Sequence, residues 1–157
     1  MSMLNMADVI PIVFGMFIAA VIGYHVLVEL QTTPEMAPAS SMLEQGKETM
    51  KFVDWMIVLA MFGLGIVVLI LAFHIRSHPA LFAIGVLALT ITVVVAAVFA
   101  NAYYDFSSDA QIAYAASQFQ LTYVIFQNLP TIVLIYGGLV AIVIYGKMAG
   151  GAPSGGF

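Results

Sequence analysis

Long stretches without charge are the feature that most constrains this chain. Its 157 residues include only four Lys and Arg and eight Asp and Glu. Four intervals, 9–28, 55–75, 77–104 and 110–146, contain no charged residue. Each holds a run that can cross a bilayer, which takes about 20 apolar residues. We therefore predict an all-α integral membrane protein with four transmembrane helices near 6–31, 52–76, 80–104 and 119–147, forming one membrane domain over residues 1–148.

The composition excludes several functional classes. Hydrophobic residues make up 63% of the chain and charged residues 8%, whereas a soluble domain carries about a quarter of its residues as charges. The absence of cysteine excludes disulfide scaffolds, cysteine metal sites and thiol catalysis. Four Lys and Arg with a net charge of −4 exclude a nucleic-acid-binding surface. The glycine-rich end, 149–157, has the composition of a flexible tail, unless a partner or a neighbouring copy holds it.

The charged residues also bear on orientation. Four spans place both termini and the 77–79 turn on one face, and the 32–51 and 105–118 loops on the other. The first face carries Asp8, Arg76 and Lys147, and the second carries Glu29, Glu35, Glu44, Lys47, Glu48, Lys51, Asp54, Asp105 and Asp109. Orientation follows the Lys and Arg count, which is two against two, but Arg76 lies in the shortest loop. This favours both termini inside, and we expect the first segment to be retained because no basic residue precedes it.

Small residues recur every four positions along three of the spans. In lipid, apolar burial gives little drive for helix association, and such stripes let two backbones approach closely. The stripes consist of Gly15, Ala19 and Gly23 in the first span; Ala88, Thr92, Ala96 and Ala100 in the third; and Gly137 and Ala141 in the fourth. They predict packing either within one molecule or between copies. The second span, rich in Val, Ile and Leu, is then expected to face lipid.

A polar interruption, Gln127-Asn128-Leu-Pro130, lies inside the fourth span. Pro130 has no N–H and leaves the carbonyl of Phe126 without its usual donor, so a kink is expected at Pro130. Gln127 or Asn128 would bond to that carbonyl or to a neighbouring helix. The alternative is a substrate or ion site at a broken helix, which the absence of a nearby charge disfavours.

Aromatic residues mark the expected boundaries of the bilayer. Trp55, Tyr103 and Tyr104 lie near the ends of the second and third spans, where aromatic side chains anchor helices at the interface. Ser41 and Glu44 have the spacing of a capping box. We expect a helix to start near Met42, with an amphipathic turn or two on the membrane surface before the second span.

The sequence predicts no catalytic, metal or cofactor site. His25 and Glu29 are four residues apart, as are His74 and His78, and such pairs can share a metal. The two pairs fall at opposite ends of the bundle, so each supplies only two ligands. Ionisable residues usually line proton and ion pathways within the membrane, and the centres of these spans contain none. We therefore expect a protein that is not an enzyme and that has no cofactor besides lipid.

The C-terminal part resembles a known group of viral proteins. Phe106-Ser-Ser-Asp-Ala leads to Gln118-Phe-Gln-Leu-Thr-Tyr-Val-Ile-Phe-Gln-Asn-Leu-Pro, followed by an aliphatic span ending in Ile-Tyr-Gly-Lys147. The pattern is similar to that of small multi-span membrane proteins of tailless icosahedral viruses with an internal membrane, and it covers about a quarter of the chain. The resemblance implies a virion membrane protein, present in many copies, that shapes the membrane vesicle and links it to the capsid. It brings no catalytic residues.

These features together predict a non-enzymatic structural membrane protein of a larger assembly, in a virion linking lipid to capsid. Its partners would be the lipid bilayer and other membrane or capsid proteins, in several copies. The alternatives are an accessory subunit of a cellular membrane enzyme or respiratory complex, a small channel, or a holin. The uncharged C-terminal tail counts against a holin. The location would be a virion internal membrane or a prokaryotic cell membrane, with several passes.

Overall fold

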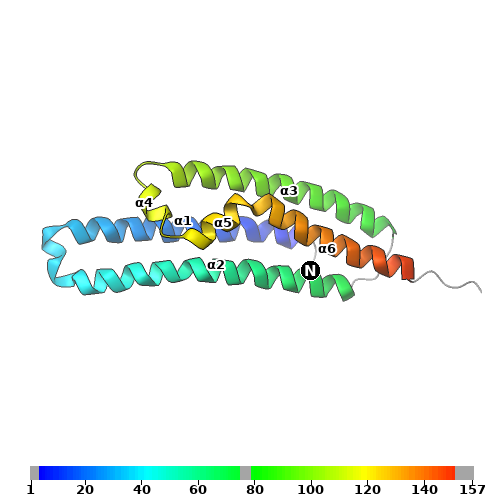
Figure 1. Ribbon diagram of the computed structural model, residues 1–157, viewed down its shortest axis with the longest axis horizontal. Helices are drawn as coiled ribbons and strands as arrows, with labels where there is room; N and C mark the ends of the chain where they lie inside the picture. The colour runs from blue at the N-terminus through cyan, green and yellow to red at the C-terminus, as the bar shows by residue number, and fades with distance from the viewer. Residues whose placement is uncertain (1–3, 75–78, 151–157) are drawn as a thin grey trace, which may run out of the picture.

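The protein is a bundle of helices in the computed structural model, which describes residues 4–74 and 79–150. The elements are α1 (Leu4–Thr32), the short 3₁₀ helix η1 (Pro34–Ala39), α2 (Ser40–His74), α3 (Pro79–Ser108), α4 (Ala113–Ala116), α5 (Gln120–Gln127) and α6 (Leu129–Gly150) (Figure 1). No strand occurs among the described residues, which confirms the all-α prediction. Arg76, His78 and the tail beyond Gly150 lie outside the described residues.

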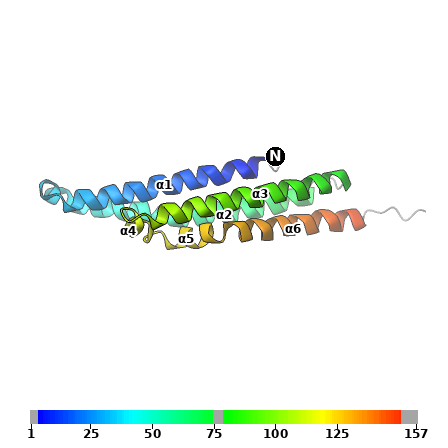
Figure 2. The same ribbon diagram turned by 90° about the horizontal axis from the view of Figure 1, so that it is seen from above.

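The long helices run along one axis in an elongated bundle (Figures 1 and 2). α1 and α2 form an antiparallel hairpin through η1, and α3 packs along α6. α2 also contacts α6, while α3 also contacts α1. The connection between α1 and α2 and the connection between α3 and α4 lie toward the same end of the bundle (Figure 1). The α1–α2 hairpin reaches farther in that direction than α3 and α4 do.

Four helices are long and apolar enough to cross a membrane: Ile10–Thr32, Pro34–His74, Phe82–Ser108 and Leu129–Gly150. This confirms four helices of spanning length. The region predicted as the fourth span, 119–147, comprises two helices, because α5 ends at Gln127 and α6 begins at Leu129. α6 alone has 22 residues, or roughly 33 Å at about 1.5 Å per residue, close to the ~30 Å of a hydrocarbon core.

An aromatic cluster forms the main core. Phe17 of α1 is fully buried, and its ring centroid lies 5.1 Å from Tyr103, 5.7 Å from Phe119, 5.8 Å from Phe126 and 6.3 Å from Phe106. These rings come from α3, α5 and the segment before α5, so one side chain joins three parts of the chain. A smaller cluster of Ala72, Val140 and Ile144 lies toward the other end.

Two glycines allow the helices to approach closely. A Cβ atom on Gly65 of α2 would collide with the ring of Tyr136 on α6, and one on Gly137 of α6 would collide with the side chain of Leu89 on α3. Gly137 belongs to a small-residue stripe found in the sequence. Gly65 has no small residue four positions away on either side, so its role is not indicated by the sequence. The role follows from the packing of α6 against α2.

We predict that Gly65→Ala destabilises the bundle and that Gly63→Ala does not. Gly65 is buried, so the added methyl must displace the Tyr136 ring, and overpacking of this kind costs about 1–3 kcal/mol. Gly63 has nothing within 4 Å of its ideal Cβ, and alanine favours a helix by up to about 1 kcal/mol. Thermal unfolding in detergent tests the pair, and equal melting temperatures would contradict this packing.

Candidate functional site

Asp54 is a buried charged residue that joins two helices. Its side chain lies on α2 and the residue is only 6% exposed. Its carboxylate accepts hydrogen bonds from the backbone N–H groups of Leu121, at 3.1 Å, and Thr122, at 2.7 Å. The hydroxyl of Thr122 also donates to Asp54 Oδ1, at 2.5 Å. Both donor residues belong to the first turn of α5, so the carboxylate caps the start of that helix.

The cap is needed because α5 does not supply its own. The first N–H groups of any helix lack partners within the helix, and a side-chain oxygen at the preceding residue usually accepts one of them. Here the preceding residue is Phe119, which has no such oxygen and is fully buried in the aromatic core. The negative carboxylate of Asp54 takes over this role and also faces the positive end of the helix dipole. It therefore fixes α5 against α2.

From the sequence, Asp54 is expected on the face that carries the 32–51 and 105–118 loops, and this contact with α5 is not predicted. No local signal in the sequence identifies this contact, because the start of α5 after Phe119, a residue with no side-chain acceptor, becomes known only from the structure.

We predict that Asp54→Ala lowers the free energy of unfolding by about 1.5–3 kcal/mol, the range for hydrogen bonds to a charged group. Thr122→Val removes only the hydroxyl bond and keeps both N–H bonds, so its effect should be clearly smaller. The exposed Asp105 provides a control as Asp105→Asn. Hydrogen exchange at the amides of residues 121 and 122 should accelerate in Asp54→Ala. Unchanged exchange there would contradict the cap.

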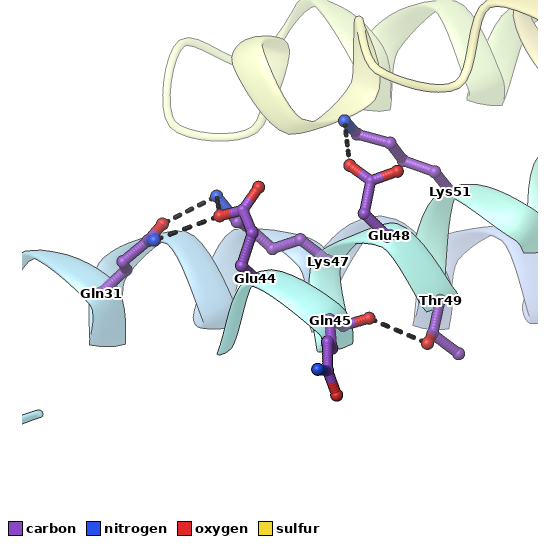
Figure 3. A network of polar contacts seen from close by, with 7 residues as sticks. All are labelled: Gln31, Glu44, Gln45, Lys47, Glu48, Thr49 and Lys51. Carbon is purple, nitrogen blue, oxygen red and sulfur yellow. Dashed lines mark hydrogen bonds and ion pairs between the residues drawn. The ribbon is translucent and has the colours of Figure 1, made fainter. Parts of the chain in front are cut away.

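The α1–α2 hairpin carries a network of polar contacts near its tip (Figure 3). The Gln31 side chain on α1 donates to Glu44 Oε2 at 3.2 Å and accepts from Lys47 Nζ at 2.7 Å. Lys47 also pairs with Glu44 at 2.7 Å, and one turn further along α2 Lys51 pairs with Glu48 at 2.9 Å. Gln31 thus ties the end of α1 to the first turns of α2.

This network shifts the ionisation of its members. Lys47 donates a hydrogen bond to Glu44, and Gln31 donates a second, so the pKa of Glu44 lies below its usual value. The same contact raises the pKa of Lys47, against a smaller opposing effect of burial. Both shifts favour the charged form of the residue concerned. Glu44 is exposed, so the pair fixes the geometry of the hairpin more than its stability.

Small residues next to this network help to set the register of α1 against α2. Gly23 of α1 lies against Met50, with its ideal Cβ position 3.5 Å from the Met50 side chain, and Gly46 of α2 lies against Leu27. The segment from Ser40 to Asp54 rises roughly 21 Å at about 1.5 Å per residue. α2 begins at Ser40, close to the start expected near Met42. Its first turns continue in line with the rest of the helix and pack against α1 (Figure 1), and their contact with a membrane surface stays a prediction.

The other small-residue stripes occupy different environments. On α1, Gly15 and Ala19 are exposed and face away from the core, in contrast to Gly23. On α3, Ala96 is fully buried, while Ala88, Thr92 and Ala100 are half-buried. Thr92, Gly137 and Ala141 line one apolar cavity between α2, α3 and α6. Thr92 of the α3 stripe therefore lies beside the α6 stripe within the molecule, whereas the α1 stripe lies mostly on the surface.

The polar interruption of the fourth span falls between α5 and α6. The side-chain nitrogen of Asn128 donates to the carbonyl of Val124 at 2.9 Å, rather than to that of Phe126. Gln127 and Asn128 are both exposed, and Pro130 lies in the first turn of α6. The helix is thus interrupted at Asn128, two residues before Pro130, and the kink at Pro130 stays a prediction.

The three residues expected to anchor the helices at the interface lie in different environments. Trp55 is 59% exposed and Tyr104 is 65% exposed, so both are on the outer surface. Tyr103 is only 1% exposed, which corrects the expectation that it faces the interface. Its ring stacks on Phe126, with centroids 5.2 Å apart, because α5 returns against α3 at this level and covers it.

The expected histidine pairs do not gather further ligands in the described part of the chain. His25 Nε2 lies 3.4 Å from Glu29 Oε1, and a ring nitrogen of His74 lies 2.9 Å from the carbonyl oxygen of Ile70. No group of three or more His, Asp or Glu that could hold a metal occurs among residues 4–74 and 79–150.

Comparisons with known proteins do not place this chain in a family. No protein-family model, curated protein or solved structure matches it.

Proposed function

We propose that the protein is a non-enzymatic structural component of a membrane assembly, in which its four long helices cross the bilayer and its α1–α2 hairpin reaches a neighbouring protein layer. The observation that carries this proposal is the α1–α2 hairpin, in which Gln31 of α1 bonds to Glu44 and Lys47 of α2. In this hairpin α2 extends well past the length that a bilayer requires. In a virion, the layer would be the capsid.

The distribution of apolar side chains supports a place in the bilayer. α2 from Asp54 to His74 rises roughly 30 Å at about 1.5 Å per residue, which matches the ~30 Å of a hydrocarbon core. Large apolar side chains are exposed along this part of α2 and along α3, where lipid would cover them: Leu59, Phe62, Ile66, Ile70, Leu87, Ile91, Val94 and Val98. Trp55 then lies at the boundary on the hairpin side. We place both termini on the inner face.

The hairpin that lies beyond this boundary has an acidic surface. Its two lysines pair with Glu44 and Glu48, so the exposed Glu29 and Glu35 leave the hairpin with a net negative charge. Asp105 and Asp109, at the other connection on the same end, are exposed as well. A partner that contacts this end is therefore expected to present Lys, Arg or hydrogen-bond donors, and such a contact weakens as salt rises.

The resemblance of the C-terminal segment to viral membrane proteins is what favours a virion over a cellular complex. An accessory subunit would use the same hairpin to contact a cofactor-bearing subunit, so the identity of the partner separates these two alternatives. A channel would instead depend on the polar residues between α5 and α6.

We predict that a photo-crosslinker placed at Glu35 in η1 captures a soluble shell protein in membrane particles that contain the full chain. The same crosslinker at Ala149, at the other end of the bundle, should not capture it. Capture of a cofactor-bearing subunit from Glu35 would replace the virion proposal with the accessory-subunit alternative. No capture from either site, together with a freely diffusing monomer in detergent, would overturn a structural role.

Conductance that changes in Asn128→Ala would instead indicate a channel.

We predict that Gly15→Leu disrupts the association of copies while leaving each molecule folded. Nothing lies within 4 Å of an ideal Cβ on Gly15, so the single chain should keep its stability within about 0.5 kcal/mol, as for other surface substitutions. A bulky side chain would, however, prevent close helix approach between copies. Val67→Ile on the exposed face of α2 is the matched control. Crosslinking of copies in membranes measures the effect, and equal results for both variants would exclude this face as the contact.

A further inference from the structure

A cleft rich in hydroxyl groups lies between the end of α3 and the α4–α5 segment. Its volume is about 170 Å³, room for several water molecules at roughly 30 Å³ each. Six of the residues that line it carry a hydroxyl group: Tyr103, Tyr104, Ser107, Ser108, Ser117 and Tyr123. No lysine or arginine is among the described residues that line this cleft.

The hydroxyl of Tyr103 lacks a partner in this arrangement. The residue is 1% exposed, and no described residue forms a hydrogen bond with its hydroxyl oxygen. A buried tyrosine hydroxyl usually finds a partner, because leaving a buried polar group unpaired costs about 1–3 kcal/mol. The hydroxyl oxygen itself is covered in this structure, but Tyr103 lines the cleft, so an occupant that displaces a covering side chain can supply the missing bond.

The other hydroxyls define what such an occupant must offer. Ser107 donates to the carbonyl of Tyr104 at 3.2 Å, and Ser117 donates to the carbonyl of Tyr114 at 2.7 Å. The proton of each serine is thus engaged, and its oxygen can still accept. A phenol such as that of Tyr103 can donate. An occupant that both donates and accepts therefore fits the lining better than the phosphodiester of a phospholipid, which only accepts.

Nearby negative charges and exposed aromatic rings further limit the kind of group that the cleft can bind. Asp105 and Asp109, both exposed, lie in and just after the last turn of α3, and their negative charge disfavours an anionic group beside them. Tyr104 and Tyr123 are 65% and 41% exposed as residues, so their rings can offer apolar faces to a sugar ring. An uncharged ring bearing several hydroxyl groups combines all of these properties.

The position of the cleft along the bundle indicates the source of such a sugar ring. Tyr103 stacks on Phe126, and Asp54 caps the same helix, α5, at Thr122. The cleft therefore lies at the level of the bilayer boundary assigned under the proposed function. We propose that the cleft binds the sugar headgroup of a glycolipid in the leaflet on the hairpin side. This depth rests on the membrane placement proposed above, whereas the hydroxyl chemistry of the cleft does not.

Lipid retention by the purified full chain tests the proposal. The protein is held in a detergent without a sugar headgroup and is given monoglucosyl diacylglycerol or phosphatidylglycerol with the same acyl chains. Native mass spectrometry should show several-fold greater retention of the glycolipid, with a matching rise in melting temperature. Free glucose should give neither effect, because it lacks the acyl chains that hold the headgroup in place.

Two variants separate binding from folding. Tyr103→Phe keeps the ring that stacks on Phe126 and removes the unpaired hydroxyl, so without lipid its melting temperature should equal or exceed that of the wild type. Its preference for the glycolipid should fall several-fold. Tyr145→Phe, on the exposed surface of α6, should retain the preference.

Equal retention of both lipids by the wild type, or an unchanged preference in Tyr103→Phe, would overturn the proposal. A response to free glucose equal to that with the glycolipid would support the hydroxyl chemistry and overturn a lipid as its source. Because these measurements use a single purified chain, they are independent of the crosslinking that tests the structural role.

Discussion

The contact between Asp54 and the start of α5 determines how the second half of the chain is arranged. A buried carboxylate is costly unless donors surround it, and here Leu121 and Thr122 supply three. The contact draws α5 against α2, and with it Phe119 and Phe126 against Phe17. The aromatic core and the cleft beside Tyr103 both follow from this placement, because α5 forms one side of each.

The helical class and the four long apolar segments could be predicted from the sequence, because uncharged apolar runs of this length are typical of helices in an apolar environment. The outer faces of α2 and α3 were less predictable. Both expose large apolar side chains, so hydropathy alone does not separate a lipid-facing position from a packed one. Gly137 was found by its spacing, whereas Gly65 required knowledge of which ring lies above it.

The candidate site was hardest to predict because its parts come from distant positions. Asp54 and Thr122 are 68 residues apart, and neither position is unusual in its local sequence. Tyr103 has the sequence setting of an interface anchor, yet α5 covers it. In both instances the decisive information is the return of the chain between Ser108 and Leu129, where α4 and α5 are two short helices and α5 ends before α6 begins. Such breaks depend on tertiary contacts rather than on local propensity.

The length of α6 has a consequence for how this protein can vary. Since α6 is about as long as a hydrocarbon core is thick, the segment from residue 109 to residue 127 adds packing and surface without being required for a crossing. Within this segment, residues 119–126 are held by Asp54 and by the aromatic core, whereas the turn at 109–111 is exposed. Changes of length in that turn can therefore alter the surface at this end of the bundle while the packing of α5 stays the same.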